Sequence, residues 1–213
     1  FCPVGSPNET LCAPGTYNHL EKQQSCKKCP AGTFQAAEGA TGCGPCTEGY
    51  YCAEGAAAAL PCPAGKRKDT ALEVMDSEDD CIVCGIGTFC PVGSANESLC
   101  APGTYNSEPQ QETCLKCDAG TYQPLAGNTT CYECPGGYYC AEGSAAPLPC
   151  PGGTRTNTEL PFMTSEDDCV ICGEGTFCPV GSPNETLCAP GTYNSKPAQQ
   201  TCVECEVGTH QKL

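Results

Sequence analysis

Cysteine is the residue type with the most chemical potential in this sequence, at 24 of 213 positions. Cysteine thiolates bind zinc, exchange with other thiols or close disulfides. The spacing of Cys26, Cys29, Cys43 and Cys46 is compatible with a four-ligand zinc site. Seven Cys-x-x-Cys pairs occur along the chain, at 26/29, 43/46, 81/84, 114/117, 131/134, 169/172 and 202/205.

Structural disulfides explain these cysteines better than zinc or redox chemistry does. Zinc pairs have no reason to cover a whole chain, and an extra cysteine such as Cys52 has no role in a four-ligand site. A redox Cys-x-x-Cys motif needs one reactive pair beside a βαβ unit. The cysteine content of 24 in 213 residues is typical of disulfide scaffolds in secreted proteins. We therefore predict no metal at these cysteines.

Four asparagines head Asn-x-Ser/Thr sequons, which accept N-linked glycans in secreted proteins. Asn8, Asn96 and Asn184 recur at the same point of a repeated phrase, each followed by Glu. Asn128 heads Asn-Thr-Thr, and the matching residue one repeat earlier is Ala40. We predict glycans at all four, and no other cofactor.

Carboxylates gather before two cysteines, in "DSEDDC" (76–81) and "TSEDDC" (164–169). Calcium prefers several oxygen ligands, but no Asp-x-Asp-x-Asp-Gly loop follows either segment. A solvated acidic turn is the favoured interpretation, with calcium as a weak alternative. The weak calcium candidates are Asp76, Glu78, Asp79, Asp80, Glu166, Asp167 and Asp168.

The remaining motifs argue against catalysis, nucleic-acid binding and membrane insertion. His19 and His210 are not in equivalent places, and no phosphate loop, nucleophile elbow or His-Glu-x-x-His occurs. Two Tyr-Tyr pairs (50–51 and 138–139) are interpreted as local packing rather than as a binding stripe. The net charge is −15 and the only basic cluster is 66–68, which disfavours nucleic acid and anionic lipid. No apolar run is long enough to span a membrane, and no signal peptide is recognised.

The cysteines repeat every 88 residues, as in Cys2, Cys90 and Cys178. This period predicts two full repeats, 1–88 and 89–176, and a partial third, 177–213. Because the sequence starts and stops inside the pattern, we expect a longer parent protein.

Each repeat contains smaller units of one form: Cys, a Pro/Gly turn, Thr, an aromatic, a polar stretch and Cys. Pro14-Gly15 suits the centre of a type II turn, and the aromatic Tyr17 should form the core of its unit against a disulfide. The density of Pro and Gly excludes regular helices. The predicted fold is therefore small and disulfide-rich: an elongated tandem array of cysteine-rich β-hairpin modules with little regular secondary structure.

The segments "CPAGTF…CGPC" and "CDAGTYQPLAGNTTCYEC" resemble the ephrin-receptor-like (GCC-type) cysteine-rich repeats, which are relatives of TNF-receptor-like and EGF-like modules. The resemblance implies extracellular, elongated, disulfide-laddered hairpins used for presentation or adhesion and not for catalysis. The sequence departs from the pattern where Arg67 and Arg155 occupy the aromatic position. It also departs in "CTEGYYC" and "CPGGYYC", which carry an extra cysteine.

The disulfide connectivity follows only partly from the sequence. Cys29–Cys43 and Cys117–Cys131 bound isolated units and should pair internally. The other cysteines form groups of four, in which pairing is either sequential (first with second, third with fourth) or interleaved (first with third, second with fourth). Aligning 134–150 with the simple unit favours interleaving, as does the second half of a receptor-type module. The interleaved pairs are Cys2–Cys26, Cys46–Cys62, Cys52–Cys81, Cys84–Cys100, Cys90–Cys114, Cys134–Cys150, Cys140–Cys169, Cys172–Cys188 and Cys178–Cys202.

The near-identity of the repeats favours a mechanical or spacing role. We expect a structural extracellular glycoprotein whose tandem array self-associates into a filament, surface coat or flagellar appendage of the mastigoneme type. The alternatives are a receptor or adhesion ectodomain or stalk that binds a protein ligand, and a protist surface coat antigen. The expected location is extracellular or at the cell surface, which includes the ciliary or flagellar surface.

Overall fold

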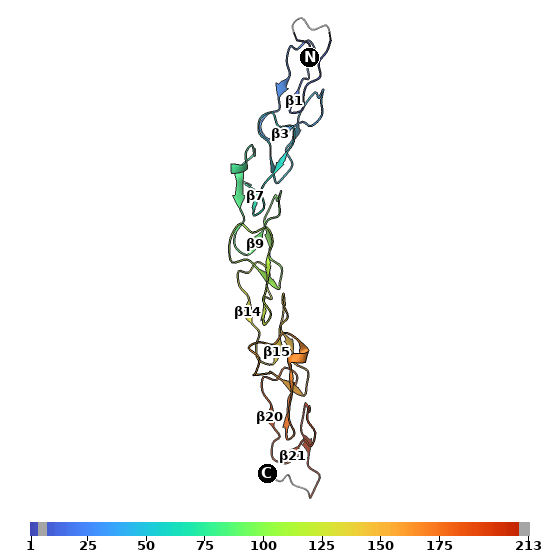
Figure 1. The fold of residues 1–213 in the computed structure, drawn as a ribbon, viewed down its shortest axis with the longest axis vertical. Helices are drawn as coiled ribbons and strands as arrows, with labels where there is room; N and C mark the ends of the chain where they lie inside the picture. Colours follow the sequence, from blue (N-terminus) through green and yellow to red (C-terminus); the bar gives the residue numbers. More distant parts are fainter. Residues whose placement is uncertain (4–7, 209–213) are drawn as a thin grey trace. The chain divides into compact units, whose positions relative to one another are not determined.

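The computed structural model describes residues 1–3 and 8–208, and within them the regular structure is almost entirely short β-hairpins (Figure 1). Each hairpin is an antiparallel pair of adjacent strands, and no larger sheet occurs among the described residues. In chain order the pairs are β1 (Thr16–Tyr17) and β2 (Lys27–Lys28), β3 (Thr33–Phe34) and β4 (Gly44–Pro45), β5 (Tyr50–Tyr51) and β6 (Leu60–Pro61), β7 (Lys66–Lys68) and β8 (Cys81–Val83), β9 (Thr88–Phe89) and β10 (Ser98–Leu99), β11 (Thr104–Tyr105) and β12 (Leu115–Lys116), β13 (Thr121–Tyr122) and β14 (Tyr132–Glu133), β15 (Tyr138–Tyr139) and β16 (Leu148–Pro149), β17 (Thr154–Arg155) and β18 (Val170–Ile171), β19 (Thr176–Phe177) and β20 (Thr186–Leu187), and β21 (Thr192–Tyr193) and β22 (Val203–Glu204). Two 3₁₀ helices, η1 (Glu78–Asp80) and η2 (Glu166–Asp168), precede β8 and β18.

A tight turn starts each hairpin. In the first, Gly15 has φ of +80°, a conformation that glycine adopts without a Cβ penalty. Thr16 then closes the turn by donating its backbone N–H and its hydroxyl to the carbonyl of Ala13, at 3.0 and 2.6 Å. The predicted fold class, a tandem array of small disulfide-rich hairpin modules, is confirmed.

The disulfides connect each hairpin to itself. Cys29–Cys43 and Cys117–Cys131 are bonded, as the sequence predicts. In the groups of four the pairing is sequential, so the interleaved prediction is wrong. The observed bonds there are Cys12–Cys26, Cys46–Cys52, Cys62–Cys81, Cys84–Cys90, Cys134–Cys140, Cys150–Cys169, Cys172–Cys178 and Cys188–Cys202; Cys100 and Cys114 are also disulfide-bonded.

Each interleaved pair fails because one of its cysteines is bonded elsewhere or free. Cys2 and Cys205 are the free cysteines. The predicted pairs that do not form are Cys2–Cys26, Cys46–Cys62, Cys52–Cys81, Cys84–Cys100, Cys90–Cys114, Cys134–Cys150, Cys140–Cys169, Cys172–Cys188 and Cys178–Cys202.

The physical reason is the turn that precedes the extra cysteine. In the eighth hairpin the backbone N–H of Tyr138 bonds to the carbonyl of Pro135, which folds the chain back within six residues. The Cα atoms of Cys134 and Cys140 are then 6.0 Å apart, within the range that a disulfide spans. The alignment predicted the hairpin, since β15 and β16 are present, but not its cysteine partners.

Sulfur forms most of the core. The buried apolar residues are cysteines, with Met75 and Met163 as the additions among the described residues. The turn aromatics Tyr17 and Tyr122 are only half-buried, so the expectation that they make up the core is wrong. Tyr51 does pack on a disulfide, against the cluster formed by Cys62, Met75 and Cys81.

The chain divides into two compact units. The first comprises Phe1–Leu99 and Glu108–Cys114, and the second comprises Cys100–Ser107 and Leu115–Leu213. The 88-residue spacing recurs in the bonded pairs, for example between Cys62–Cys81 and Cys150–Cys169. The repeat boundaries 1–88, 89–176 and 177–213 stay a prediction. The described residues contain no helix of the length and apolarity needed to cross a membrane.

Candidate functional site

The contacts between hairpins form the most regular feature within each unit. Neighbouring hairpins are joined by backbone hydrogen bonds in both directions: Gly32 donates to the carbonyl of Cys52, and Gly55 donates to that of Cys29, both at 2.8 Å. In the second unit Gly120 donates to Cys140 and Gly143 to Cys117 in the same way, again at 2.8 Å. These bonds satisfy backbone groups that a two-residue strand leaves unpaired.

The turn glycine of a hairpin also reaches the hairpin after the next. A Cβ on Gly49, before β5, would overlap with the carbonyl oxygen of Gly93, which lies between β9 and β10. Gly137, before β15, faces Gly181 between β19 and β20 in the same way. The same skip of one hairpin relates Gly15 to Gly55, Gly32 to Val74, Gly103 to Gly143, Gly120 to Phe162 and Gly153 to Ala198. These glycines are therefore needed for close backbone approach as well as for their turns.

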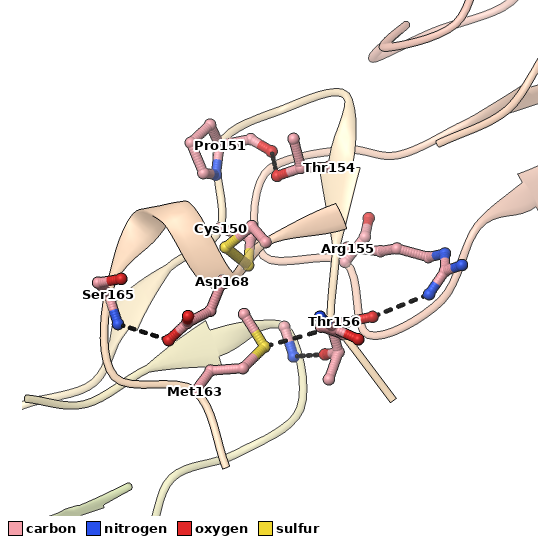
Figure 2. The surroundings of a disulfide bond; sticks show 12 residues. Cys150, Pro151, Thr154, Arg155, Thr156, Met163, Ser165 and Asp168 are labelled. Atoms are coloured by element: carbon pink, nitrogen blue, oxygen red, sulfur yellow. Dashed lines mark hydrogen bonds between the residues drawn. A yellow bond between two sulfur atoms is a disulfide. The ribbon is translucent and has the colours of Figure 1, made fainter. Parts of the chain in front are cut away.

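The loop closed by Cys150–Cys169 shows how the acidic segments are used (Figure 2). The carboxylate of Asp168 accepts hydrogen bonds from the backbone N–H groups of Thr164, at 2.7 Å, and Ser165, at 3.0 Å. These bonds, with that from Thr164 the stronger contribution, lower the pKa of Asp168 because they favour its charged form. In the first unit Asp80 accepts from Asp76 and Ser77, and its pKa is lowered likewise.

The calcium candidates are not arranged as a ligand set. No group of three or more His, Cys, Asp or Glu side chains that could hold a metal occurs in the part of the chain described. Asp80 and Asp168 are the third residues of η1 and η2, where each completes a capping box with Ser77 or Ser165, and the other candidates lie in the same helical turn or precede it. The segments thus have a structural use, in capping, that the sequence analysis did not identify.

The same loop is tied to the hairpin before it. The backbone N–H of Asn157 points to Met163 Sδ at 3.3 Å, and the backbone N–H of Gly137 donates to the hydroxyl of Thr156. Cys140 donates to the carbonyl of Met163 at 3.0 Å. Figure 2 shows the sulfur of Met163 directed toward the backbone next to Thr156. The loop therefore has a defined conformation despite its short regular structure.

Arg155 links this hairpin to a sequon. Its guanidinium donates to the carbonyl of Thr156 at 2.9 Å, and its Nε lies 3.7 Å from a carboxylate oxygen of Glu185. That same oxygen accepts the backbone N–H of Gly173 at 3.2 Å. Glu185 is the central residue of the sequon headed by Asn184.

Arg67 makes the equivalent pair with Glu97, also at 3.7 Å, and Glu97 accepts from Gly85. Arginine in the aromatic position is thus explained by its reach to the sequon of the following hairpin. Sequence reasoning found the departure but not its partner, although the 88-residue recurrence of both Arg and Glu is a signal that could have linked them.

The sequon asparagines fall into two groups. Asn8, Asn96 and Asn184 are exposed. Asn128 is half-buried, and its side-chain nitrogen donates to Gln123 Oε1 at 3.1 Å and to the carbonyl of Leu125 at 3.3 Å. A glycan replaces one of the two hydrogens on that nitrogen, so these two bonds cannot both persist in a modified chain.

Two of the paired tyrosines and the histidine have packing partners. Ring atoms of Tyr50 lie beside Gly93, and those of Tyr138 beside Gly181, so both rings pack on the hairpin after the next, which supports packing over a binding stripe but not a purely local contact. His19 stacks on Tyr17 with ring centroids 5.9 Å apart. His210 lies outside the described residues.

Two comparisons with known proteins agree with this architecture. Residues 2–42 and 103–146 match the family model described as "Tyrosine-protein kinase ephrin type A/B receptor-like". These two segments of the chain are thus similar to ephrin-receptor-like repeats. The chain is also 29% identical over 214 residues to the human "Signal peptide, CUB and EGF-like domain-containing protein 2". That alignment covers 99% of this chain but 15% of the human protein, so the chain spans a small part of its relative's length.

The resemblance inferred from the sequence is thereby confirmed. The chain is a cysteine-rich repeat segment of the extracellular type, similar to modules found in receptor ectodomains and in EGF-like proteins.

Proposed function

We propose that this chain is a structural spacer array of an extracellular glycoprotein, whose copies associate into a filament, a surface coat or a flagellar appendage. The observation that carries the proposal is the double linkage of hairpins, to the next by hydrogen bonds and to the one after by a glycine contact. Within each unit, hairpins linked in this way resist bending at their junctions, which suits a load-bearing or spacing role.

Two further features support a structural role. The turn, the disulfide and the capping carboxylate recur at equal spacing, as expected of a scaffold built by repeating one structural unit. The exposed sequons of the second and third repeats are each held by an arginine and a backbone N–H, which fixes where a sugar would project. The proposed location is the cell or ciliary surface.

Assembly is the property to test. Sedimentation velocity of the glycosylated chain across a hundredfold concentration range should show growth of oligomers, and electron microscopy should show regular filaments or sheets. A chain that stays monomeric and instead binds saturably to intact cells would contradict the structural proposal and favour a receptor or adhesion ectodomain.

A further inference from the structure

The second unit contains a groove of about 440 Å³ between the β13–β14 hairpin and the loop that precedes η2. Its apolar wall is formed by Tyr138, Leu160, Pro161 and Phe162, over the buried Met163. Leu160 is 39% exposed and Phe162 is 52% exposed. Exposed large apolar side chains in one concave place are typical of binding surfaces.

The groove is held open by the fold and does not depend on a mobile side chain. Phe162 lies against the turn glycine Gly120, where there is no Cβ to displace it. The next residue, Met163, is fixed through its carbonyl, which accepts the backbone N–H of Cys140 at 3.0 Å. Because hydrogen bonds hold the loop at Asn157 and at Met163, the apolar side chains between them keep a defined position in the groove wall.

The charges around the groove have one sign. Asp118 and Glu133 line it, and no lysine or arginine is among its described lining residues. Neither carboxylate belongs to an ion pair found in the described residues. A carboxylate pair next to an apolar wall complements a ligand that carries a cation beside an apolar group.

The first unit has the same groove in a different form, of about 140 Å³. Val74 replaces the phenylalanine, Glu73 replaces the proline, and Lys68 places a cation in the lining itself. The two repeats thus differ in size, apolarity and charge at this one structural position. The first groove is lined by Glu48 and Glu73 together with Lys68, whereas the lining of the second contains two carboxylates and no cation among the described residues.

We propose that the groove of the second unit binds a segment of a protein partner in which leucine or a similar apolar residue alternates with arginine or lysine. The apolar side chains lie against Leu160 and Phe162, and the cations lie near Asp118 and Glu133. This interaction is independent of whether copies of the chain assemble.

The test uses the full chain and a fluorescein-labelled peptide of alternating leucine and arginine, with binding measured by fluorescence anisotropy. We expect Phe162→Ser and the double variant Asp118→Asn/Glu133→Gln each to weaken binding at least tenfold. The matched controls in the first groove, Val74→Ser and Glu48→Gln/Glu73→Gln, should change it less than twofold. Peptides with glutamate for arginine, or serine for leucine, should not bind measurably.

Three outcomes would overturn the proposal. Equal losses in the control variants would show diffuse attraction to an acidic chain. Undiminished binding in both groove variants would exclude the groove. A loss of self-association in Phe162→Ser, without a change in peptide binding, would assign the groove to a second copy of the chain. Disulfide mapping verifies folding, and Phe162→Val, which carries the residue of the first repeat, replaces Phe162→Ser if the latter misfolds.

Discussion

At the scale of single residues, hydrogen bonds from a few polar side chains fix the backbone of loops that apolar packing would hold in place in a larger domain. The carboxylates of Asp80 and Asp168 each satisfy two backbone N–H groups at the start of a one-turn helix. Buried Gln123 similarly donates to the carbonyl of Thr130 at 2.6 Å and accepts from the N–H of Leu125 at 3.0 Å. Losing such a hydrogen bond is costly, because a donor or acceptor that is shielded from water is then left without a partner.

Replacing Asp168 with alanine should lower the free energy of unfolding by about 1 kcal/mol at pH 7, since it removes a cap of this kind. The native pKa of Asp168 is lowered from its ordinary value of 3.8, so the contribution is complete well above pH 3.8 and is lost as the pH falls through the native pKa. The difference between wild type and Asp168→Ala should therefore shrink in acid. Calorimetric unfolding at pH 7 and below pH 3 checks this.

Asp167→Ala is the matched control, because Asp167 is exposed and does not accept the two capping hydrogen bonds that its neighbour Asp168 accepts. Equal destabilisation by both substitutions, or a difference that does not change with pH, would contradict the capping role.

At the scale of the hairpin, two requirements act on the same turn glycine: a positive φ and a close approach by the backbone of another hairpin. The effects of the two requirements can be measured separately by comparing Gly137 with Gly191. Both have φ of +86°, but Gly137 faces the carbonyl of Gly181, whereas Gly191 has no described atom within 4 Å of a Cβ position.

Gly191→Ala should cost about 1 kcal/mol of unfolding free energy, the penalty for an L-residue with positive φ. Gly137→Ala should cost distinctly more, about 3 kcal/mol, because the added Cβ must also displace Gly181. Thermal unfolding of the two oxidised variants makes the comparison. If the two substitutions cost the same, the contact between hairpins contributes no stability.

The hairpins themselves were predictable from the sequence, because Pro-Gly turns, threonine and bounding cysteines are local signals. The two isolated pairs, Cys29–Cys43 and Cys117–Cys131, were predictable for the same reason. The connectivity of the groups of four was not, because cysteine spacing alone does not show that the turn at Pro135–Tyr138 brings Cys134 back to Cys140. Contacts that skip one hairpin, such as Gly49 to Gly93, and the partner of Arg155 depend on tertiary packing and left no local signal.

At the scale of the whole molecule, disulfides supply the stability that a hydrophobic core supplies in a larger domain. A disulfide that closes a loop of about 15 residues contributes roughly 3 kcal/mol on the chain-entropy model. Against this, the buried apolar residues that are not cysteine are Met75 and Met163 within the described part of the chain.

Reduction should therefore unfold the entire chain without denaturant. We expect addition of excess dithiothreitol to collapse the amide chemical-shift dispersion in NMR spectra and to expand the chain in X-ray scattering. Persistent dispersion in the fully reduced, alkylated protein would mean that the hydrogen-bonded hairpins are stable by themselves.

Glycosylation is the second property of the whole chain to check. Glycopeptide mass spectrometry of protein secreted from eukaryotic cells should find sugar at Asn8, Asn96 and Asn184, which are exposed. Occupancy at Asn128 should be lower, because the folded hairpin uses its side-chain nitrogen in hydrogen bonds to Gln123 and Leu125. Complete occupancy at Asn128 together with bare Asn96 and Asn184 would contradict this order.

The contacts that skip one hairpin also limit which duplications can lengthen the array without disturbing its packing. If a single hairpin were duplicated, the hairpins that flank the insertion would each be one place further apart. A turn glycine there, such as Gly137, would then face a hairpin other than the one that it fits. Copying five consecutive hairpins, the content of one 88-residue period between β1 and β11, gives every new hairpin the partners its sequence already fits. Duplication of complete 88-residue repeats therefore preserves the packing between hairpins. Natural length variants of this array should differ by multiples of 88 residues.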